Sequence, residues 1–314
     1  MIMGKITGLV AATFAAYHEN GEVNVAIIPQ IVDKLIVDGV SGVFVCGTNG
    51  EGPNLTVEER QAIVEAYVKA ANKRIKVIVH VGHSSVKEAR KLAAHAEQVG
   101  ADAFSSVSAF YFKPASVKAL VTSLAEIASA APNTPFYYYN IPHLTGISMD
   151  MLELIKLAEE MIPNFAGLKY TASTLHEYEA CVNYKDGKYD VLYGLDEMLL
   201  GALAVGAKGA VGSTYTFAAP LYNKVIENFE NGNMEEARRL QMVSIKMVQS
   251  LGKFSPIPAQ RAIVDMGGFE LGSCRLPLIG LTSEERKRLK EDLEAKDFFK
   301  QVDQCRATAS APNH

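Results

Sequence analysis

The segment PFYYYNIPHLTGISMDMLELIKLAEEMIPNFAGLKY, residues 135–170, contains the repeating unit from which the fold can be predicted. Two short apolar runs, Pro135–Asn140 and Ala166–Tyr170, lie on either side of a stretch with helical periodicity. Apolar runs of this length are typical of strands that are covered on both faces, and the helix between them would bring the chain back to begin a parallel neighbour. The segment therefore predicts a βαβ unit.

The same alternation extends through about two thirds of the chain. The candidate strands are Ile6–Thr13, Gly42–Cys46, Lys76–Val81, Ala103–Val107, Pro135–Asn140, Ala166–Tyr170, Val191–Tyr193 and Gly209–Gly212. Eight strands, each alternating with a helix, are the number that closes a barrel. We therefore predict an α/β fold in which residues 1–218 form a (β/α)8 TIM barrel that carries the active site.

The pattern changes after Pro220, where helical stretches follow one another without a strand. These stretches are Leu221–Asn231, Met234–Leu251, Pro258–Met266 and Ser283–Lys296. They predict a C-terminal helical extension over residues 219–305. Residues 306–314 are small and polar, which is typical of a disordered tail.

A doubly wound open sheet is the competing architecture. Such a sheet would normally carry a glycine-rich phosphate-binding turn after its first strand. The corresponding turn here is Thr13-Phe14-Ala15-Ala16, which contains no glycine. The barrel is therefore the favoured prediction.

The composition excludes several classes of function. The 31 basic and 35 acidic residues give a net charge of −4, so no nucleic-acid partner is expected. The longest apolar runs, Gly8–Ala16 and Met198–Val205, are much shorter than the ~20 residues that span a membrane. No basic segment precedes an apolar one at the N-terminus, so no secretory signal is expected. The four cysteines form no CxxC pair, and free thiols indicate a cytoplasmic protein.

In a barrel, chemistry is expected at the carboxyl ends of the strands, and Lys169 lies at such an end after the apolar residues 165–168. Burying an unpaired ammonium is costly, so a lysine in this position is either paired or reactive. A neutral amine there can attack a ketone and form a Schiff base, which then accepts electrons. The alternative is a lysine whose long side chain reaches solvent from the strand end.

Tyr139 favours the reactive interpretation of Lys169. It ends the fifth candidate strand, next to the sixth, and the strand pleat turns Tyr137 and Tyr139 to the same face. A phenol beside the lysine could transfer protons and bind the carboxylate of a 2-oxo acid. The alternative is that this aromatic run only fills the barrel core.

Two further groups of polar residues follow strand ends. The turn at residues 47–52 contains three glycines together with Thr48 and Asn49, so its backbone N–H groups could bind an anion. Asp196 and Glu197 follow Gly194 and could accept hydrogen bonds from substrate hydroxyls, with Ser213 and Thr214 in support. Acidic residues in the first turn of a helix also stabilise its dipole, which is the structural alternative.

No metal site is predicted. His80 and His83 are three residues apart in an extended segment, so their side chains point to opposite faces and cannot chelate one ion together.

Four short motifs carry a resemblance to a known family. They are Gly-Thr-Asn-Gly-Glu at 47–51, Tyr-Asn-Ile-Pro at 139–142, Gly-Leu-Lys at 167–169 and Gly-Ser-Thr-Tyr at 212–215. With these motifs the chain resembles, over nearly its whole length, the N-acetylneuraminate lyase and dihydrodipicolinate synthase superfamily of class I, pyruvate-dependent aldolases. The resemblance implies a barrel with a helical extension, assembled as a homotetramer that binds pyruvate and a sugar acid. It also implies that no cofactor is needed, because the lysine imine accepts the electrons.

The resemblance also implies roles for individual residues. Lys169 would form the Schiff base, Tyr139 would be the acid and base, Thr48 and Asn49 would hold the pyruvate carboxylate, and Thr171 would lie near the reacting sugar carbons. The residues that match the family's contacts to the glycerol tail and ring hydroxyls of a sialic acid are Gly194, Asp196, Glu197 and Ser213. Tyr111 matches an aromatic residue near the subunit interface, where it could contribute to a neighbouring site.

The position five residues after Tyr139 favours one branch of the family. Synthases that act on an aspartate-derived semialdehyde have an arginine there to hold a second carboxylate, whereas this chain has Leu144. The expected activity is therefore reversible cleavage of N-acetylneuraminate to N-acetylmannosamine and pyruvate. The alternatives are an aldolase for another 2-keto-3-deoxy sugar acid and a non-catalytic barrel that binds sialic acid or pyruvate. Asn49, which replaces the usual hydroxyl residue, is the feature that favours the non-catalytic barrel.

Overall fold

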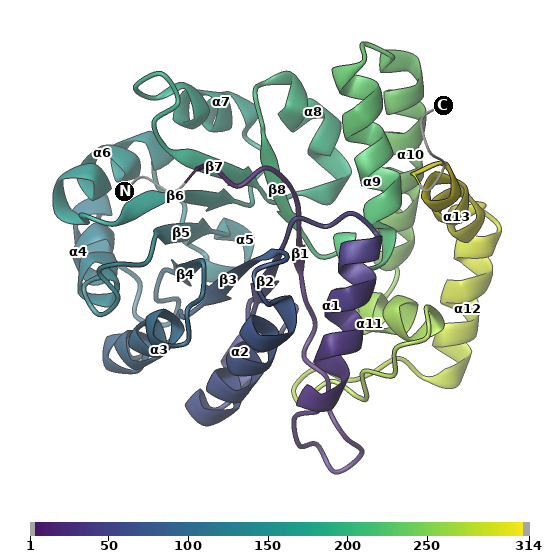
Figure 1. Cartoon of the computed structure of the whole chain (residues 1–314), viewed down its shortest axis with the longest axis horizontal. Helices are drawn as coiled ribbons and strands as arrows, with labels where there is room; N and C mark the ends of the chain where they lie inside the picture. Colours follow the sequence, from purple (N-terminus) through teal and green to yellow (C-terminus); the bar gives the residue numbers. More distant parts are fainter. Residues whose placement is uncertain (1–3, 310–314) are drawn as a thin grey trace.

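The computed structural model describes residues 4–309, and its centre is a closed barrel of eight parallel strands arranged in chain order (Figure 1). The strands are β1 (Gly8–Ala12), β2 (Gly42–Val45), β3 (Lys76–His80), β4 (Ala103–Val107), β5 (Phe136–Asn140), β6 (Phe165–Tyr170), β7 (Asp190–Tyr193) and β8 (Gly209–Gly212). Each strand pairs in parallel with the next, and β8 pairs with β1 to close the ring. The predicted fold class is confirmed, and the open sheet is excluded.

Helices follow the strands and cover the outside of the barrel. They are α1 (Ile28–Val37), α2 (Val57–Ala71), α3 (Val86–Gln98), α4 (Val117–Ala128), α6 (Met151–Met161), α7 (Leu175–Asn183), α8 (Leu199–Ala204) and α9 (Tyr215–Glu230). Shorter turns are α5 (Pro142–Thr145) and the 3₁₀ segments η1 (Val25–Ile27), η2 (Gly52–Asn54) and η3 (Asp196–Met198). Capping boxes of Thr56 with Glu59 and of Thr282 with Glu285 each satisfy free N–H groups at a helix start.

The strand pleat divides the apolar core into two parts. Tyr138 belongs to the layer between the strands and the outer helices. Tyr137 and Tyr139 belong to a separate cluster inside the barrel, which also contains Phe44 and Val211. The expectation that Tyr137 and Tyr139 share a face is therefore confirmed, and that face is the interior.

The C-terminal helices stack beside α9 on one side of the barrel (Figure 1). They are α10 (Met234–Leu251), α11 (Pro256–Met266), α12 (Ser283–Glu294) and α13 (Phe298–Ala309). Helix α9 is kinked at Ala218, where φ is −130°, two residues before Pro220. The predicted boundary between residues 218 and 219 falls at this kink, and the division of the chain there stays a prediction. No helix within residues 4–309 is both long enough and apolar enough to cross a membrane.

One prediction about the C-terminus is wrong. Disorder was expected from Arg306 onward, but α13 continues to Ala309. The helix is anchored because Val302 and Cys305 are buried and because Arg306 forms an ion pair with Asp38 of α1, with 3.0 Å between Nε and Oδ1. A polar composition does not reveal such contacts, which come from a helix far away in the sequence. The rest of the predicted tail, residues 310–314, lies outside the described residues.

Candidate functional site

A cavity of about 550 Å³ opens at the carboxyl ends of the strands. The predicted site residues that line it are Thr48, Asn49, Tyr139, Lys169, Thr171, Gly194, Asp196, Glu197 and Ser213. They come from the ends of β2, β5, β6, β7 and β8 or from the segments that follow. The fold therefore brings these residues, which are spread over most of the barrel sequence, into a single cavity, as expected for a (β/α)8 barrel.

Lys169 lies inside the barrel wall and does not extend into bulk water. It is 4% exposed, and its Nζ atom lies 4.0 Å from the centroid of the Phe44 ring and 3.9 Å from that of Tyr139. Within residues 4–309, no carboxylate forms an ion pair with it. The side chain is therefore held between two aromatic faces at the cavity wall. The alternative of a lysine that reaches solvent is wrong.

The Tyr139 ring is fixed by aromatic contacts, and its hydroxyl lies near Thr48. Phe44 and His80 pack edge-on against it, with interplanar angles of 77° and 89°. The Tyr139 hydroxyl lies 3.4 Å from Thr48 Oγ1, a distance at which either oxygen could donate. The phenol can therefore exchange a proton with a neighbouring hydroxyl while its ring faces the amine of Lys169.

The turn that carries Thr48 and Asn49 is held from behind by the helical extension. Glu51 has a left-handed backbone (φ 50°) and a fully buried carboxylate. Its Oε1 lies 3.3 Å from Arg261 Nη1, and its Oε2 accepts the backbone N–H of Arg275 at 3.0 Å. The carboxylate thus fixes the end of the turn against residues that lie more than two hundred positions later in the chain.

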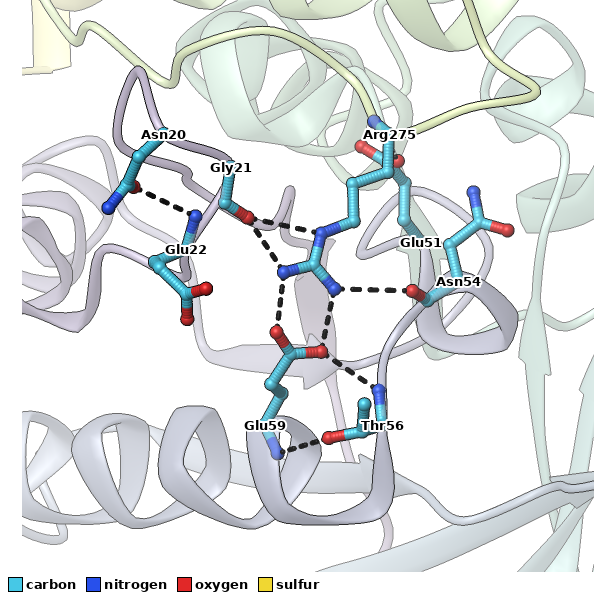
Figure 2. Close-up of polar contacts among 8 residues, drawn as sticks. All are labelled: Asn20, Gly21, Glu22, Glu51, Asn54, Thr56, Glu59 and Arg275. Atoms are coloured by element: carbon cyan, nitrogen blue, oxygen red, sulfur yellow. Dashed lines mark hydrogen bonds and ion pairs between the residues drawn. The ribbon is translucent and has the colours of Figure 1, made fainter.

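Arg275 links three segments around this turn (Figure 2). Its guanidinium forms a two-pronged ion pair with Glu59 in the first turn of α2, and donates to the carbonyls of Gly21 and Asn54. Residues of this cluster line a separate hollow of about 990 Å³ on the other side of α11. The smaller cavity is the candidate site, because Lys169 and Tyr139 line it, whereas the arginines of the larger hollow are engaged with carboxylates and carbonyls.

Asp196 is buried at the cavity wall and is held through one oxygen. Its Oδ2 accepts the backbone N–H of Thr214 at 2.8 Å and the hydroxyl of Thr214 at 2.6 Å. Burial raises the pKa of Asp196 from 3.8 to about 6, and the hydrogen bonds from Thr214 oppose the rise. The neighbouring Glu197 and Ser213 are half-buried at the same wall. Asp196 therefore lines the cavity. Asp196 and Glu197 also lie in the first turn of η3, where the structural alternative places them.

Two glycines at this wall let side-chain oxygen atoms lie close to the backbone, because they have no Cβ atom. A Cβ atom on Gly212 would lie 1.9 Å from Asp196 Oδ1, and one on Gly194 would lie 2.1 Å from Thr171 Oγ1. The Thr171 hydroxyl is buried and has no hydrogen-bond partner within the described part of the chain. It lines the cavity, and so it offers a donor and an acceptor to a bound molecule.

The two histidines considered for a metal have separate environments. His80 Nδ1 lies 3.1 Å from the Cys46 carbonyl, whereas His83 Nδ1 accepts the backbone N–H of Ser85. Burial, together with Arg60 and Lys169, holds the pKa of His80 well below its usual value, so its ring is neutral. Within residues 4–309, no group of three or more His, Cys, Asp or Glu side chains could hold a metal ion.

Tyr111 is the predicted residue that the fold leaves outside the cavity. It follows β4 and is 79% exposed, and its ring packs against that of Phe112. Its expected role at a subunit interface stays a prediction.

The helical extension provides one wall of the cavity, which could not be predicted from the sequence. The residues of this wall are Val248, Leu251, Gly252, Ser255, Pro256, Ile257, Gln260 and Leu278. Their spacing in α10 and α11 shows which helix faces are apolar but not which partner they cover. No signal in a single sequence identifies the barrel mouth as that partner.

This fold and site define a class of protein, the (β/α)8 barrel with a buried lysine and tyrosine at the carboxyl ends of neighbouring strands. Within that class, the chain belongs to the dihydrodipicolinate synthetase family, whose sequence profile matches residues 5–296.

Individual relatives are similar over most of their length. The chain is 44% identical to N-acetylneuraminate lyase A of Xenopus laevis over 284 residues, which cover 87% of this chain and 91% of the relative. It is 42% identical to N-acetylneuraminate lyase of Xenopus tropicalis, with 92% and 98% covered. The solved structure of N-acetylneuraminate lyase (sialic acid aldolase) from Aliivibrio salmonicida superimposes with a TM-score of 0.91 at 40% identity, with 94% of this chain and 98% of that chain covered.

Proposed function

We propose that this protein is an N-acetylneuraminate lyase, a carbon–carbon lyase that reversibly cleaves N-acetylneuraminate to N-acetylmannosamine and pyruvate. The observation that carries the proposal is the position of Lys169, buried at the cavity wall with its amine between the rings of Phe44 and Tyr139. The lyase relatives, similar along nearly their full length, support the substrate.

The reaction begins with an imine. The neutral amine of Lys169 attacks the C2 ketone of the open-chain sugar acid, and loss of water leaves a protonated imine. Thr48 and Asn49 would hold the substrate carboxylate, since both line the cavity near Tyr139.

Bond cleavage then needs one proton transfer and one electron sink. Tyr139 takes the proton of the C4 hydroxyl, the C3–C4 bond breaks, and its electron pair forms the enamine as the positive charge of the imine is lost. N-acetylmannosamine leaves as the aldehyde. Protonation of the enamine at C3 and hydrolysis of the imine release pyruvate and restore Lys169.

The remaining residues would position the sugar. The buried Thr171 hydroxyl, which lacks a partner within residues 4–309, would contact the reacting carbons. Asp196, Glu197 and Ser213 lie along one wall and would bind the distal hydroxyls. None of the described residues that line the cavity is an arginine, and Leu144 lines it. A substrate with a second carboxylate therefore finds no bidentate partner there.

We also propose that the protein is a cytoplasmic homotetramer. The four cysteines are free, which suits a reducing compartment. The strongly exposed side chains of Tyr111 and Phe112 suit a subunit contact, because large exposed apolar groups favour burial. Light scattering of the wild type and of Tyr111→Ala tests the assembly, and a variant that stays tetrameric would remove Tyr111 from the contact.

Trapping by borohydride tests the catalytic proposal. Reduction in the presence of pyruvate should attach a stable three-carbon adduct to Lys169, and Lys169→Ala should show no adduct and no turnover. Absence of an adduct on Lys169, or full turnover by Lys169→Ala, would refute an imine mechanism. Comparable turnover of short 2-keto-3-deoxy acids would instead favour the other sugar-acid aldolase.

A further inference from the structure

A line of buried hydroxyl groups connects the carboxylate of Asp196 to the helical extension. The Thr214 hydroxyl lies 2.6 Å from Asp196 Oδ2 and 2.7 Å from the hydroxyl of Tyr222 in α9. The Tyr222 hydroxyl in turn lies 2.7 Å from Ser244 Oγ in α10. Tyr222 and Ser244 are completely buried, and Thr214 is nearly so. Each of these contacts is therefore made without competition from water.

The protons in this line have a single consistent arrangement. An ionised carboxylate only accepts, so the one hydroxyl proton of Thr214 points to Asp196. Thr214 Oγ1 must then accept the proton of Tyr222, whose oxygen accepts from Ser244. Burial raises the pKa of Tyr222 far above its usual value, so this phenol stays protonated. The hydroxyls of Thr214 and Tyr222 thus each donate once and accept once, and Ser244 donates to Tyr222, an arrangement that strengthens the bonds along the line.

The backbone beneath Asp196 is held from the same helix. Gln241, which is one turn before Ser244 in α10, donates from Nε2 to the Asp196 carbonyl at 3.3 Å. Its Oε1 accepts the backbone N–H of Leu200 at 2.9 Å. Helix α10 therefore holds both the main chain and the side chain of Asp196.

These contacts leave one oxygen of Asp196 for a ligand. Oδ2 has both donors of Thr214, whereas Oδ1 lies against Gly212 and forms no hydrogen bond within residues 4–309. Both Asp196 and Gly212 line the cavity. The direction of Oδ1 is set by the bonds to Oδ2, because a carboxylate is planar.

We propose that Tyr222 and Ser244 are positioning residues that act through Thr214 to aim Oδ1 of Asp196 at the distal hydroxyl groups of the sugar acid. This inference rests on the proposed function. Tyr222 and Ser244 lie outside the cavity and act on recognition of the sugar tail. They take no part in capturing pyruvate, since that half of the substrate is held by Lys169, Thr48 and Asn49.

The test compares Tyr222→Phe with a matched control. Tyr222→Phe removes one hydroxyl and keeps the ring. Tyr178→Phe is the control, because the Tyr178 hydroxyl is also buried and donates at 2.9 Å to the Val191 carbonyl on the outer side of the barrel. The measurements are kcat and KM for N-acetylneuraminate cleavage, and the rate at which borohydride traps pyruvate on the enzyme.

For Tyr222→Phe we expect kcat/KM to fall about tenfold, the size expected for loss of one buried hydrogen bond, with most of the change in KM. The rate of pyruvate trapping should stay within about twofold of the wild type, and Ser244→Ala should show a smaller change of the same kind. Tyr178→Phe should lower thermal stability without changing kcat/KM.

Parallel loss of pyruvate trapping and cleavage in Tyr222→Phe would show a general structural role and overturn the proposal, as would an unchanged KM. If Tyr222→Phe does not fold, the same criteria apply to Ser244→Ala. Failure of the proposed function has a different signature, since the wild type itself would then trap no pyruvate or leave N-acetylneuraminate intact.

Discussion

Lys169 and Tyr139 lie side by side in register on β6 and β5, and the amine of the lysine is 3.9 Å from the centre of the tyrosine ring. The amine therefore faces the ring and not the hydroxyl, which lies near Thr48 instead. This arrangement separates two functions of one side chain. The ring shields the amine from water, and in the proposed mechanism the hydroxyl exchanges protons at the cavity.

The first prediction separates these two functions. Tyr139→Phe keeps the ring between Phe44 and His80 and removes the proton-transfer group. Pyruvate trapping on Lys169 should persist, while kcat for cleavage should fall by about 10²–10⁴-fold, the usual contribution of a general acid or base. Borohydride trapping and steady-state assays of one preparation measure both. A variant that cleaves at the wild-type rate would exclude the hydroxyl as the proton carrier.

The second prediction concerns acid pH. Burial raises the pKa of Asp196 to about 6, so the carboxylate gains a proton as the pH falls through this value. A protonated Asp196 loses part of its capacity to accept hydrogen bonds from sugar hydroxyls. KM for the sugar acid should therefore rise below about pH 6 in the wild type. In Asp196→Asn, KM should be high at every pH and should lack this step, and a step that survives in the variant would assign the titration to another group.

The third prediction uses the close contact at Gly212. A Cβ atom there would lie 1.9 Å from Asp196 Oδ1, so Gly212→Ala must displace the carboxylate. We expect kcat/KM for N-acetylneuraminate to fall at least about tenfold, since one aimed acceptor is lost. Gly280→Ala is the control, because no atom lies within 4 Å of the added Cβ. Equal kinetics in the two variants would contradict the assigned position of Asp196.

The fourth prediction concerns stability. Arg261→Met removes the cation that faces the buried carboxylate of Glu51 and keeps most of the side-chain volume. Breaking a buried ion pair from one side typically costs about 3–5 kcal/mol, because the remaining charge loses its oppositely charged partner. Lys91→Ala breaks an exposed pair with Glu88 and should cost much less, because water screens an exposed pair. Urea unfolding of both variants checks the difference, and equal losses would show that the Glu51–Arg261 pair adds nothing beyond a surface pair.

Much of the candidate site could be predicted because it follows from strand order. Lys169 and Tyr139 end consecutive strands, and consecutive strands of a parallel barrel are neighbours, so the two could be placed together without coordinates. The same rule placed Thr48, Asp196 and Ser213 at one mouth. The alternation of side chains along a strand was enough to place Tyr137 and Tyr139 on one face, and the structure shows that this face is the barrel interior.

The contacts that organise Asp196 could not be predicted in this way. Its side-chain partner Thr214 is 18 residues away, and Gln241, which holds its carbonyl, is 45 residues away in a helix of the extension. A polar residue on a helix face has many possible partners, and single-sequence periodicity does not choose among them. The helical tail at residues 306–309 was missed for the same reason, since Arg306 finds its partner in α1.

The amino-acid sequence by itself determined the barrel, the location of the candidate site and the neighbourhood of Lys169 and Tyr139. The strand and helix periods are local patterns, and in a parallel barrel strands that follow one another in the chain lie side by side. Tertiary structure alone decided that α10 and α11 form the far wall of the cavity and that Tyr222 and Ser244 reach Asp196 through Thr214. These contacts depend on how helices pack against the barrel, and that packing is set by the fit of whole surfaces that no short stretch of sequence contains.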